Sequence, residues 1–289
     1  MFHCVNGELT DEASLQVSPF DHGFLYGMGL FETFRTYSGH PFLLDDHFHR
    51  LHASAEQMQI KLPAYDRERT LAVIYDLLKK NNTADAYFRW NITAGERGIG
   101  LPSAPYDAPN EFVFVKQLPA SFPAEKQAVT LNQRRNTPET AVRMKSHHYF
   151  NNIAGRQELG NAAGVEGIFL TEDGFVSEGI VSNIFWRKGQ TVFTPDLSCG
   201  CLPGTARSYI ITAARKAGLQ VESGRFSLAH AQAADEVWLT NAIQEIVPVS
   251  VWDEAIFSGQ SGEVYRKLRS VYHQHCRQLF SLADWQYES

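Results

Sequence analysis

Residues 30–60, LFETFRTYSGHPFLLDDHFHRLHASAEQMQI, combine a strand pattern with a helix pattern. Apolar and polar residues alternate through the first eight positions, which is the period of a half-buried β-strand. After Asp45 and Asp46, whose charges suit a helix N-terminus, apolar residues recur at helical spacing. These apolar residues are Phe48, Leu51, Ala55 and Met58. The segment therefore predicts a strand followed by an amphipathic helix.

Similar patterns surround this segment in the first half of the chain. VNGEL predicts a short hairpin, residues 66–80 predict a helix, and AYFRWNIT and EFVFVK predict further strands. The stretch QLPASFPAEK, residues 117–126, holds two prolines and little periodicity, as interdomain linkers do. We expect an α+β (mixed α/β) fold of two domains. The expected limits are 1–118 for a smaller N-terminal α/β domain, 119–126 for a linker, and 127–289 for a larger C-terminal domain with a β-rich core and helices.

The second half begins with four short strand patterns, GIFL, FVSEG, VSNIFWRK and TVFTP. Asp173-Gly174 and Lys188-Gly189 between them are hairpin turn signals, so we expect an antiparallel meander. A helix is expected from Thr205 to Leu219 with Gly218 as its C-terminal cap. A strand EVWLTN and a final helix over residues 262–282 complete the expected elements.

Composition excludes several classes of function. The formal charge of −6, with no basic run, argues against a protein that neutralises a nucleic-acid backbone. The start of the sequence lacks a secretion signal, and no apolar stretch approaches the length of a membrane span. We therefore expect a cytoplasmic protein without a membrane partner, acting on a small molecule.

Four scattered cysteines are expected to be reduced thiols rather than a disulfide framework. Cys199-Gly200-Cys201 could form half of a metal site, but no second pair stands at zinc-like spacing. A tight loop is the better interpretation. His47, His49 and His52 also suggest metal, yet positions 47 and 49 lie on opposed sides of a helix, so a half-buried histidine face is favoured. We expect no metal.

Four features could carry chemistry, each with an ordinary alternative. Leu202-Pro203-Gly204-Thr205 opens a helix whose exposed amides could bind phosphate, although many helices begin this way without a ligand. Arg50 is a fork-shaped cation suited to phosphate or carboxylate. Lys145 in MKSHHY would be a nucleophilic amine if desolvated, but most lysines are simply solvated. Glu178 in VSEGIVSNIFW could face solvent, or could hold a pyridine nitrogen in its protonated form.

In this order along the chain, these features resemble the fold-type IV pyridoxal-phosphate enzymes, which include branched-chain and D-amino-acid aminotransferases and 4-amino-4-deoxychorismate lyases. The anchors are SPFDHGFLYGMGLFETFR, HFHRL, RMKSHHY, EGIVSNIFW, LPGTAR and TNAIQEIVPV. They extend over nearly the whole chain.

The resemblance implies a role for each anchor. Lys145 would be the Schiff-base lysine and general base, and Glu178 would pair with the pyridine nitrogen of pyridoxal 5'-phosphate. Tyr149 matches a tyrosine that hydrogen-bonds the cofactor ring oxygen in branched-chain aminotransferases. The residues implied to hold the phosphate are Arg50, Gly204, Thr205, Ala206, Asn241 and Ala242. Substrate contacts are expected at Tyr26, Thr33, Arg89, Asn91 and Arg97.

Two departures separate the chain from the aminotransferases. They usually carry Gly-Thr or a similar pair where this chain has Asn241-Ala242, and FRWNITAGERG lacks a clear Arg-x-His carboxylate trap. Within the group, residues 134–152 and 165–189 look most like Bacillus-type 4-amino-4-deoxychorismate lyases. The resemblance thus implies a homodimeric enzyme that eliminates pyruvate from aminodeoxychorismate to give 4-aminobenzoate for folate biosynthesis. The alternatives are an aminotransferase of the same fold and a binding protein that has kept the fold without the cofactor, which would be expected to lose Lys145 or Glu178.

Overall fold

The computed structural model describes residues 1–286, apart from the side chain of Gln286. The chain forms two compact units. The first unit holds residues 1–119, Lys145–His148 and the C-terminal residues from His275, and the second holds Ala120–Met144 and Tyr149–Gln274. The linker over residues 119–126 remains a prediction, although Lys126 already begins a strand.

The first unit contains α1 (His22–Leu25), α2 (Leu44–Gln57), α3 (Arg67–Lys80), α8 (Leu282–Gln286), β1 (Phe2–Val5), β2 (Glu8–Asp11), β3 (Gly29–Tyr37), β4 (His40–Pro41), β5 (Tyr87–Thr93) and β6 (Asn110–Lys116), with a 3-10 turn at Glu12–Ser14. The second contains α4 (Phe150–Leu159), α5 (Thr205–Lys216), α6 (Leu228–Gln232), β7 (Lys126–Thr130), β8 (Val165–Leu170), β9 (Val176–Gly179), β10 (Asn183–Lys188), β11 (Thr191–Pro195), β12 (Gln220–Gly224), β13 (Glu236–Asn241), β14 (Glu245–Trp252) and β15 (Ala255–Ile256), with 3-10 turns at Leu197–Cys199 and Gly259–Ser261. Helix α7 (Glu263–His275) joins the second unit to the C-terminal residues of the first.

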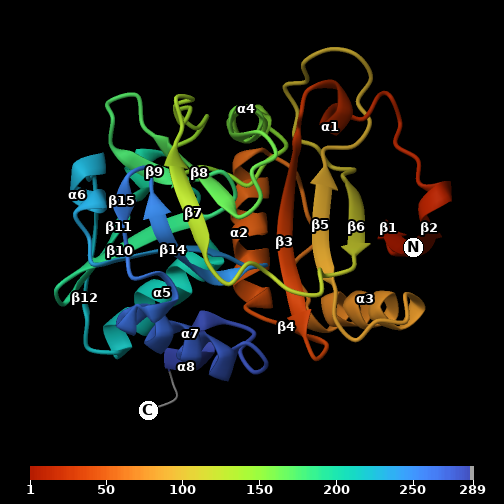
Figure 1. The fold of residues 1–289 in the computed structure, drawn as a ribbon. Helices are drawn as coiled ribbons and strands as arrows, with labels where there is room; N and C mark the ends of the chain where they lie inside the picture. The colour runs from red at the N-terminus through yellow and green to blue at the C-terminus, as the bar shows by residue number, and fades with distance from the viewer. Residues whose placement is uncertain (287–289) are drawn as a thin grey trace. The chain divides into compact units, whose positions relative to one another are not determined.

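The first unit is a six-stranded antiparallel sheet in the order β2-β1-β6-β5-β3-β4 (Figure 1). Alternation along β3 sends Leu30, Glu32 and Phe34 to one face. Helix α2 packs on that face, where Phe34 stacks on Phe88 and lies 5.6 Å from the ring of His47. The opposite face of the same strands carries most of the substrate contacts expected from the sequence.

The second unit is built on a nine-stranded sheet in the order β12-β11-β10-β13-β14-β7-β8-β9, with β15 on β14. The pairs β11–β12, β14–β7 and β7–β8 are parallel and the others antiparallel. Trp186, Trp238 and Trp252 are fully buried in this unit. A mixed sheet of this kind brings the ends of β9, β10 and β13 near the start of α5, as the contacts below show.

Most elements expected from periodicity are confirmed. Asp66 caps α3 by accepting a hydrogen bond from the amide of Arg69, and the hairpins at Gly174 and Gly189 have the positive φ angles that their turn signals require. The fold class is confirmed as mixed α/β. None of the helices in residues 1–286 has the length and apolar character needed to cross a membrane.

Two expectations were wrong. The predicted meander is interrupted, because β10 pairs with β13 while β9 pairs only with β8. The single final helix is divided into α7 and α8, with residues 276–281 between them. Trp285 of α8 is buried and contacts the ring of His275, whereas Tyr287 lies outside the described residues.

Candidate functional site

Lys145 lies on a short segment that adds to the edge of β3. The amide of Phe31 donates to the carbonyl of Lys145, and the amide of His147 donates to the carbonyl of Gly29, each at 2.9 Å. These two bonds form an antiparallel bridge centred on Leu30 and Ser146. The Lys145 amine lies 4.6 Å from the centre of the Phe31 ring. Backbone pairing therefore fixes the lysine against the first unit, which no local sequence pattern indicates.

The sheet face next to Lys145 carries three of the expected substrate contacts. Thr33 is the register partner of Arg89, and Phe31 is the partner of Asn91, so all four side chains share one face. The Arg89 guanidinium lies 3.5 Å from the centre of the Phe31 ring, and its Nε donates to Asn91 at 3.3 Å. The structure thus brings Thr33, Arg89, Asn91 and Lys145 together on the face opposite α2.

His147 is packed between this face and Gly29. Its Nε2 contacts the Asn91 amide oxygen at 3.0 Å. Burial, with help from the nearby positive charge of Arg89, lowers the pKa of His147 to about 4. The imidazole is therefore neutral near pH 7. It serves as a hydrogen-bonding group two residues after Lys145 in the chain.

Tyr26 and Arg97 lie on the loops at α1 and between β5 and β6. The hydroxyl of Tyr26 accepts a hydrogen bond from the amide of Gly100 at 2.9 Å. Arg97 donates to Asp107 at 2.6 Å and to the carbonyl of Pro105. Both side chains hold loop structure here, and their roles as substrate contacts remain predictions.

Arg50 projects from α2 onto β3. Its Nε donates to one oxygen of Glu32 at 2.7 Å and a terminal nitrogen donates to the other at 2.5 Å. Nδ1 of His47 contacts the same carboxylate at 2.7 Å. His47 is fully buried rather than part of a half-buried face, which corrects the sequence interpretation at that position. Its ring is withdrawn from solvent because Glu32 provides a buried partner.

In the second unit, Glu178 is a buried carboxylate with partners on both oxygens. Arg135 donates to Oε1 through Nε at 2.9 Å and lies 2.7 Å from it through a terminal nitrogen. Oε2 accepts from the amide of Leu202 at 2.9 Å and, at 3.4 Å, from the side chain of Asn183. Arg143 lies 3.9 Å from Oε1, and burial followed by the charge of Arg135 lowers the pKa of Arg143 to about 10. Two arginines, a backbone amide and an asparagine therefore surround this buried carboxylate.

The loop LPGTAR leads directly from this carboxylate to the start of α5. Gly204 is the N-cap residue and provides no side-chain cap, so the helix amides are not capped by that residue. A β-carbon at Gly204 would lie 2.1 Å from the side-chain oxygen of Asn183, so a larger residue would force the Asn183 side chain to move. Thr205 and Ala206 are buried at the first turn. This helix N-terminus can hold an anion such as phosphate.

The turn after β13 completes the second-unit cluster. Thr240 pairs in register with Asn183, and its buried hydroxyl lacks a hydrogen-bond partner among the described residues. Asn241 follows it, and its side-chain oxygen accepts from the amides of Ile243 and Gln244. The Asn241 side chain therefore stabilises its own turn, which leads through Ala242. Contact of either residue with a phosphate remains a prediction.

Tyr149 is the N-cap residue of α4, where its carbonyl accepts a hydrogen bond from the amide of Ile153. It belongs to the second unit, while the neighbouring residues Lys145–His148 belong to the first. Its role beside a cofactor ring stays a prediction.

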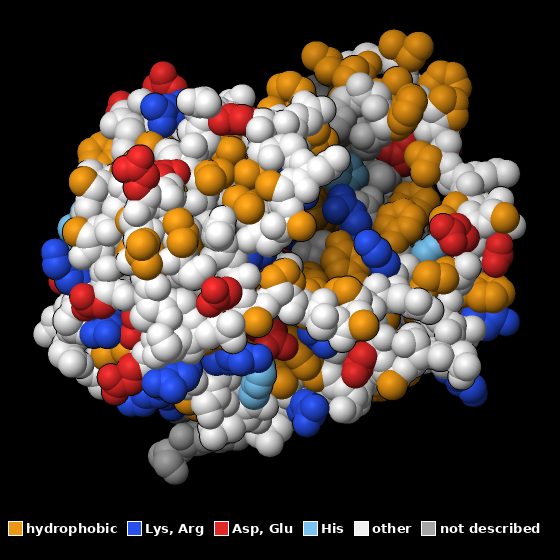
Figure 2. All heavy atoms as spheres, in the orientation of Figure 1, with side chains coloured by type: hydrophobic (Ala, Val, Ile, Leu, Met, Phe, Trp, Pro, Cys, Tyr) orange, Lys and Arg blue, Asp and Glu red, His pale blue; other side chains and the backbone are white. Residues whose placement is uncertain are grey.

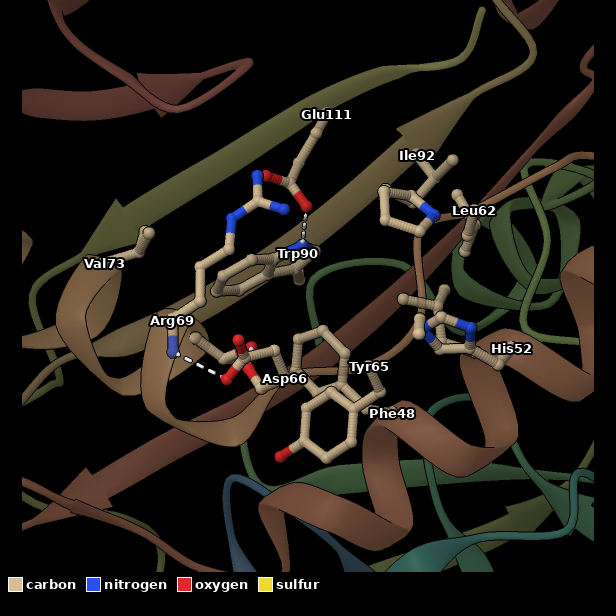
Figure 3. A pocket seen from close by; sticks show the side chains of 14 residues that line it. Phe48, His52, Leu62, Tyr65, Asp66, Arg69, Val73, Trp90, Ile92 and Glu111 are labelled. Carbon is tan, nitrogen blue, oxygen red and sulfur yellow. Dashed lines mark hydrogen bonds between the residues drawn. The ribbon is translucent and has the colours of Figure 1, made fainter. Parts of the chain in front are cut away.

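A small cavity of about 50 Å³ in the first unit contains none of the expected site residues. Phe48, Tyr65 and Trp90 line it, and the indole nitrogen of Trp90 donates to Glu111 (Figure 3). Sites for organic ligands usually enclose several hundred Å³. The cavity is therefore a packing gap between α2, α3 and the sheet.

The cysteines are buried free thiols, and Cys199 and Cys201 lie in the tight loop at Gly200. No group of three potential metal ligands occurs in residues 1–286.

Known proteins resemble this chain in sequence and in fold. Residues 29–252 match the model of the amino-transferase class IV family. The chain belongs to that family. It is 46% identical over 278 residues to aminodeoxychorismate lyase of Bacillus subtilis, with 95% of this chain and 94% of that protein covered. It is 34% identical to a putative branched-chain-amino-acid aminotransferase of Methanocaldococcus jannaschii, covering 93% and 94% of the two chains.

Two solved structures show the same fold. The 4-amino-4-deoxychorismate lyase of Pseudomonas aeruginosa superposes with a TM-score of 0.84 at 27% identity, covering 95% of this chain and 99% of that one. A branched-chain amino acid aminotransferase of Escherichia coli gives a TM-score of 0.85 at 28% identity, covering 95% and 94%. The predicted resemblance is confirmed at the level of the family and its fold.

Sequence reasoning missed Glu32, Arg135, Asn183 and Thr240, and it assigned His47 only to a half-buried histidine face. Glu32 had a signal, because it falls on the same phase of its strand as Leu30 and Phe34 and must be buried with them. Arg135 lies in a segment without periodicity, and its partner is 43 positions away. Only the folded chain shows that pair.

Proposed function

We propose that this class IV protein is a pyridoxal-phosphate-dependent 4-amino-4-deoxychorismate lyase, which releases pyruvate and forms 4-aminobenzoate for folate biosynthesis. The similarity to the B. subtilis lyase across 95% of the chain is the observation that carries the proposal. The second candidate is an aminotransferase, favoured by the 34% identity to the M. jannaschii protein.

The residues of the second unit fit the cofactor. The start of α5, where the N-cap residue Gly204 has no side chain, suits a phosphate, and the buried Glu178 suits a protonated ring nitrogen. The bond from Asn183 to Glu178 is the longest of the carboxylate's hydrogen bonds, so it is the one that a ring nitrogen would most easily replace. The unpartnered hydroxyl of Thr240, opposite Asn183, adds a buried polar group that a ligand could satisfy. Arg50 is the proposed phosphate ligand from the first unit.

When bound, pyridoxal phosphate supplies an electron sink for the substrate carbon that bears the amino group. The protein's own contribution centres on Lys145. Its amine would accept the proton from that carbon, and the electron pair of the broken C–H bond would form a C=C bond in the ring as the neighbouring C–O bond breaks. The leaving enolpyruvate would take the proton back from the Lys145 ammonium and become pyruvate. Loss of pyruvate makes the ring aromatic, so orientation and proton transfer are the main tasks left to the protein.

Arg89, Thr33 and Asn91 share a sheet face and are proposed to orient the substrate. A guanidinium is well suited to a substrate carboxylate because it donates two parallel hydrogen bonds. Contact with Phe31 holds the Arg89 guanidinium in place before substrate arrives.

The decisive experiment treats the purified protein with aminodeoxychorismate and measures pyruvate and 4-aminobenzoate. We expect both products, and we expect borohydride to bleach a yellow protein and leave a reduced adduct on Lys145. Turnover of D-alanine or leucine with 2-oxoglutarate, without pyruvate and 4-aminobenzoate from aminodeoxychorismate, would assign the protein as an aminotransferase instead of a lyase. A colourless protein that takes up no pyridoxal phosphate would contradict both enzyme assignments and favour a binding protein.

We also propose a homodimer, because apolar side chains are exposed on the loops at α1 and between β5 and β6. Phe24 is 70% exposed, Ile99 84% and Leu101 87%, and Figure 2 shows hydrophobic side chains gathered over this part of the first unit. Clustered apolar side chains of this kind mark interaction surfaces. Light scattering should give twice the chain mass, and Leu101→Ser should weaken association. The cytoplasmic location stays a prediction.

A further inference from the structure

The guanidinium of Arg50 is held on one side by a fully buried carboxylate. Glu32 has no exposed side-chain surface, while Arg50 retains 12%. Two of the five N–H groups of the arginine, those on the Nε edge, are committed to the two oxygens of Glu32. A bidentate pair fixes both the position and the plane of the guanidinium.

His47 supports the carboxylate from the same helix. His47 and Arg50 are three residues apart on α2, so they project from the same side and reach Glu32 together. Burial raises the pKa of Glu32, but Arg50 and His47 outweigh burial and hold that pKa at about 2. Burial lowers the pKa of His47, so the imidazole is a neutral donor to the carboxylate.

We propose that Glu32, supported by His47, is a positioning residue that orients Arg50 for binding the phosphate of the cofactor. The inference rests on the proposed function, because it takes Arg50 as a phosphate ligand. An arginine side chain that is already fixed loses less conformational freedom when it binds.

The charges of Glu32 and Arg50 determine how a substitution at Glu32 should affect phosphate binding. Glu32 cancels the charge of Arg50, so the pair attracts phosphate through directed N–H groups rather than through net charge. Replacing Glu32 by Gln would remove a negative charge, which by itself favours an anion. It would also release the guanidinium from its bidentate contact. We expect the loss of orientation to dominate, because a single misplaced ligand weakens several hydrogen bonds to the same phosphate.

The test compares pyridoxal phosphate with pyridoxal, which lacks the phosphate. Apo-protein is titrated with each compound by absorbance, for the wild type, Glu32→Gln, Arg50→Ala and the double variant. Glu32→Gln should weaken pyridoxal phosphate binding by about 10- to 100-fold and leave pyridoxal binding within about twofold, since a hydrogen bond to a charged group is worth that much. In the Arg50→Ala background the same substitution should change little, because neighbours that act through one group are not additive.

Glu111→Gln is the matched control. Glu111 is another strand glutamate of the first unit, and it bonds Trp90 rather than any expected site residue. Its substitution should leave both affinities unchanged. His47→Gln keeps the Glu32–Arg50 pair and should shift the phosphate-specific affinity in the same direction by a smaller factor, even where Glu32→Gln fails to fold.

Equal weakening of pyridoxal and pyridoxal phosphate by both Glu32→Gln and His47→Gln would overturn the inference and indicate a general structural role. An undiminished effect of Glu32→Gln in the Arg50→Ala background would also overturn it. Wild-type protein that binds neither compound would instead remove the proposed function itself, and the inference with it.

Discussion

Substituting Gly29 by Ala should displace the segment that carries Lys145 without altering the lysine. A β-carbon at Gly29 would lie 2.2 Å from a ring carbon of His147 and 2.7 Å from the carbonyl oxygen of Ile92. Ordinary carbon contacts are about 3.5 Å, so the imidazole must move by more than about 1 Å. The same residue accepts one of the two backbone hydrogen bonds that hold residues 145–147 on β3.

The expected change in the free energy of unfolding is the difference between two opposing contributions. Overpacking a tight site costs about 1–3 kcal/mol, and replacing glycine by alanine returns about 0.4–1 kcal/mol by restricting the unfolded chain. We expect the free energy of unfolding to fall by about 1–2 kcal/mol, measured by urea denaturation. The rate of borohydride-trapped adduct formation at Lys145, measured by mass spectrometry, should fall more than stability alone explains.

Two further variants distinguish the steric clash with His147 from a general effect of replacing glycine by alanine. Gly39→Ala meets no atom within 4 Å but has a φ of +82°, so it should cost stability through backbone strain and leave trapping at Lys145 unchanged. His147→Ala in the Gly29→Ala background should restore part of the lost stability, because the ring is the nearest obstacle. Wild-type stability and trapping in Gly29→Ala would refute the argument that this contact positions the lysine.

Three other outcomes are expected. The pKa of His147 is lowered in the folded protein, so the unfolded state takes up the proton first as the pH falls. The free energy of unfolding should therefore fall by roughly 1 kcal/mol per pH unit between pH 6.5 and pH 4. His147→Gln should flatten this part of the plot of urea midpoint against pH. Burial raises the pKa of Cys199 to about 11 and of Cys201 to about 12, so iodoacetamide at pH 8 should label neither in native protein and both in urea, as read by mass spectrometry. Arg135→Met leaves buried Glu178 without its closest cation and should lower the free energy of unfolding by about 3 kcal/mol, whereas a loss below about 1 kcal/mol would show that Arg143 suffices.

Sequence reasoning succeeded where structure is decided locally. Helices α2 and α3 follow from apolar spacing, and the turns at Gly174 and Gly189 follow from the need for positive φ. It failed where distant segments pair. Strand β7 lies between β14 and β8 in the sheet, and periodicity carries no information about such partners. The break after α7 was missed because residues 276–281 continue the apolar pattern across a bend.

The candidate site shows the same division. Arg50, Glu178 and Gly204 were named as candidates because their order along the chain resembled that of a family, whereas the groups that contact them were not named. Glu32 and Arg135 act only through contacts made after folding, and each holds a predicted residue rather than a ligand. A residue that contacts only another site residue can be recognised in the sequence by a charge at a buried position of a strand, which is a weaker signal than an ordered motif.

The hydrogen bonds of Glu178 explain why its position matters beyond charge. One oxygen is bonded to the amide of Leu202, two residues before the glycine that begins α5, so the carboxylate and the helix N-terminus are parts of one rigid network. Asn183 bonds both the carboxylate and the Leu202 carbonyl, and thereby fixes the spacing between them. A ligand with a ring nitrogen at one end and a phosphate at the other would meet both partners at a spacing set before it binds. Binding such a ligand would then require little reorganisation of the second unit.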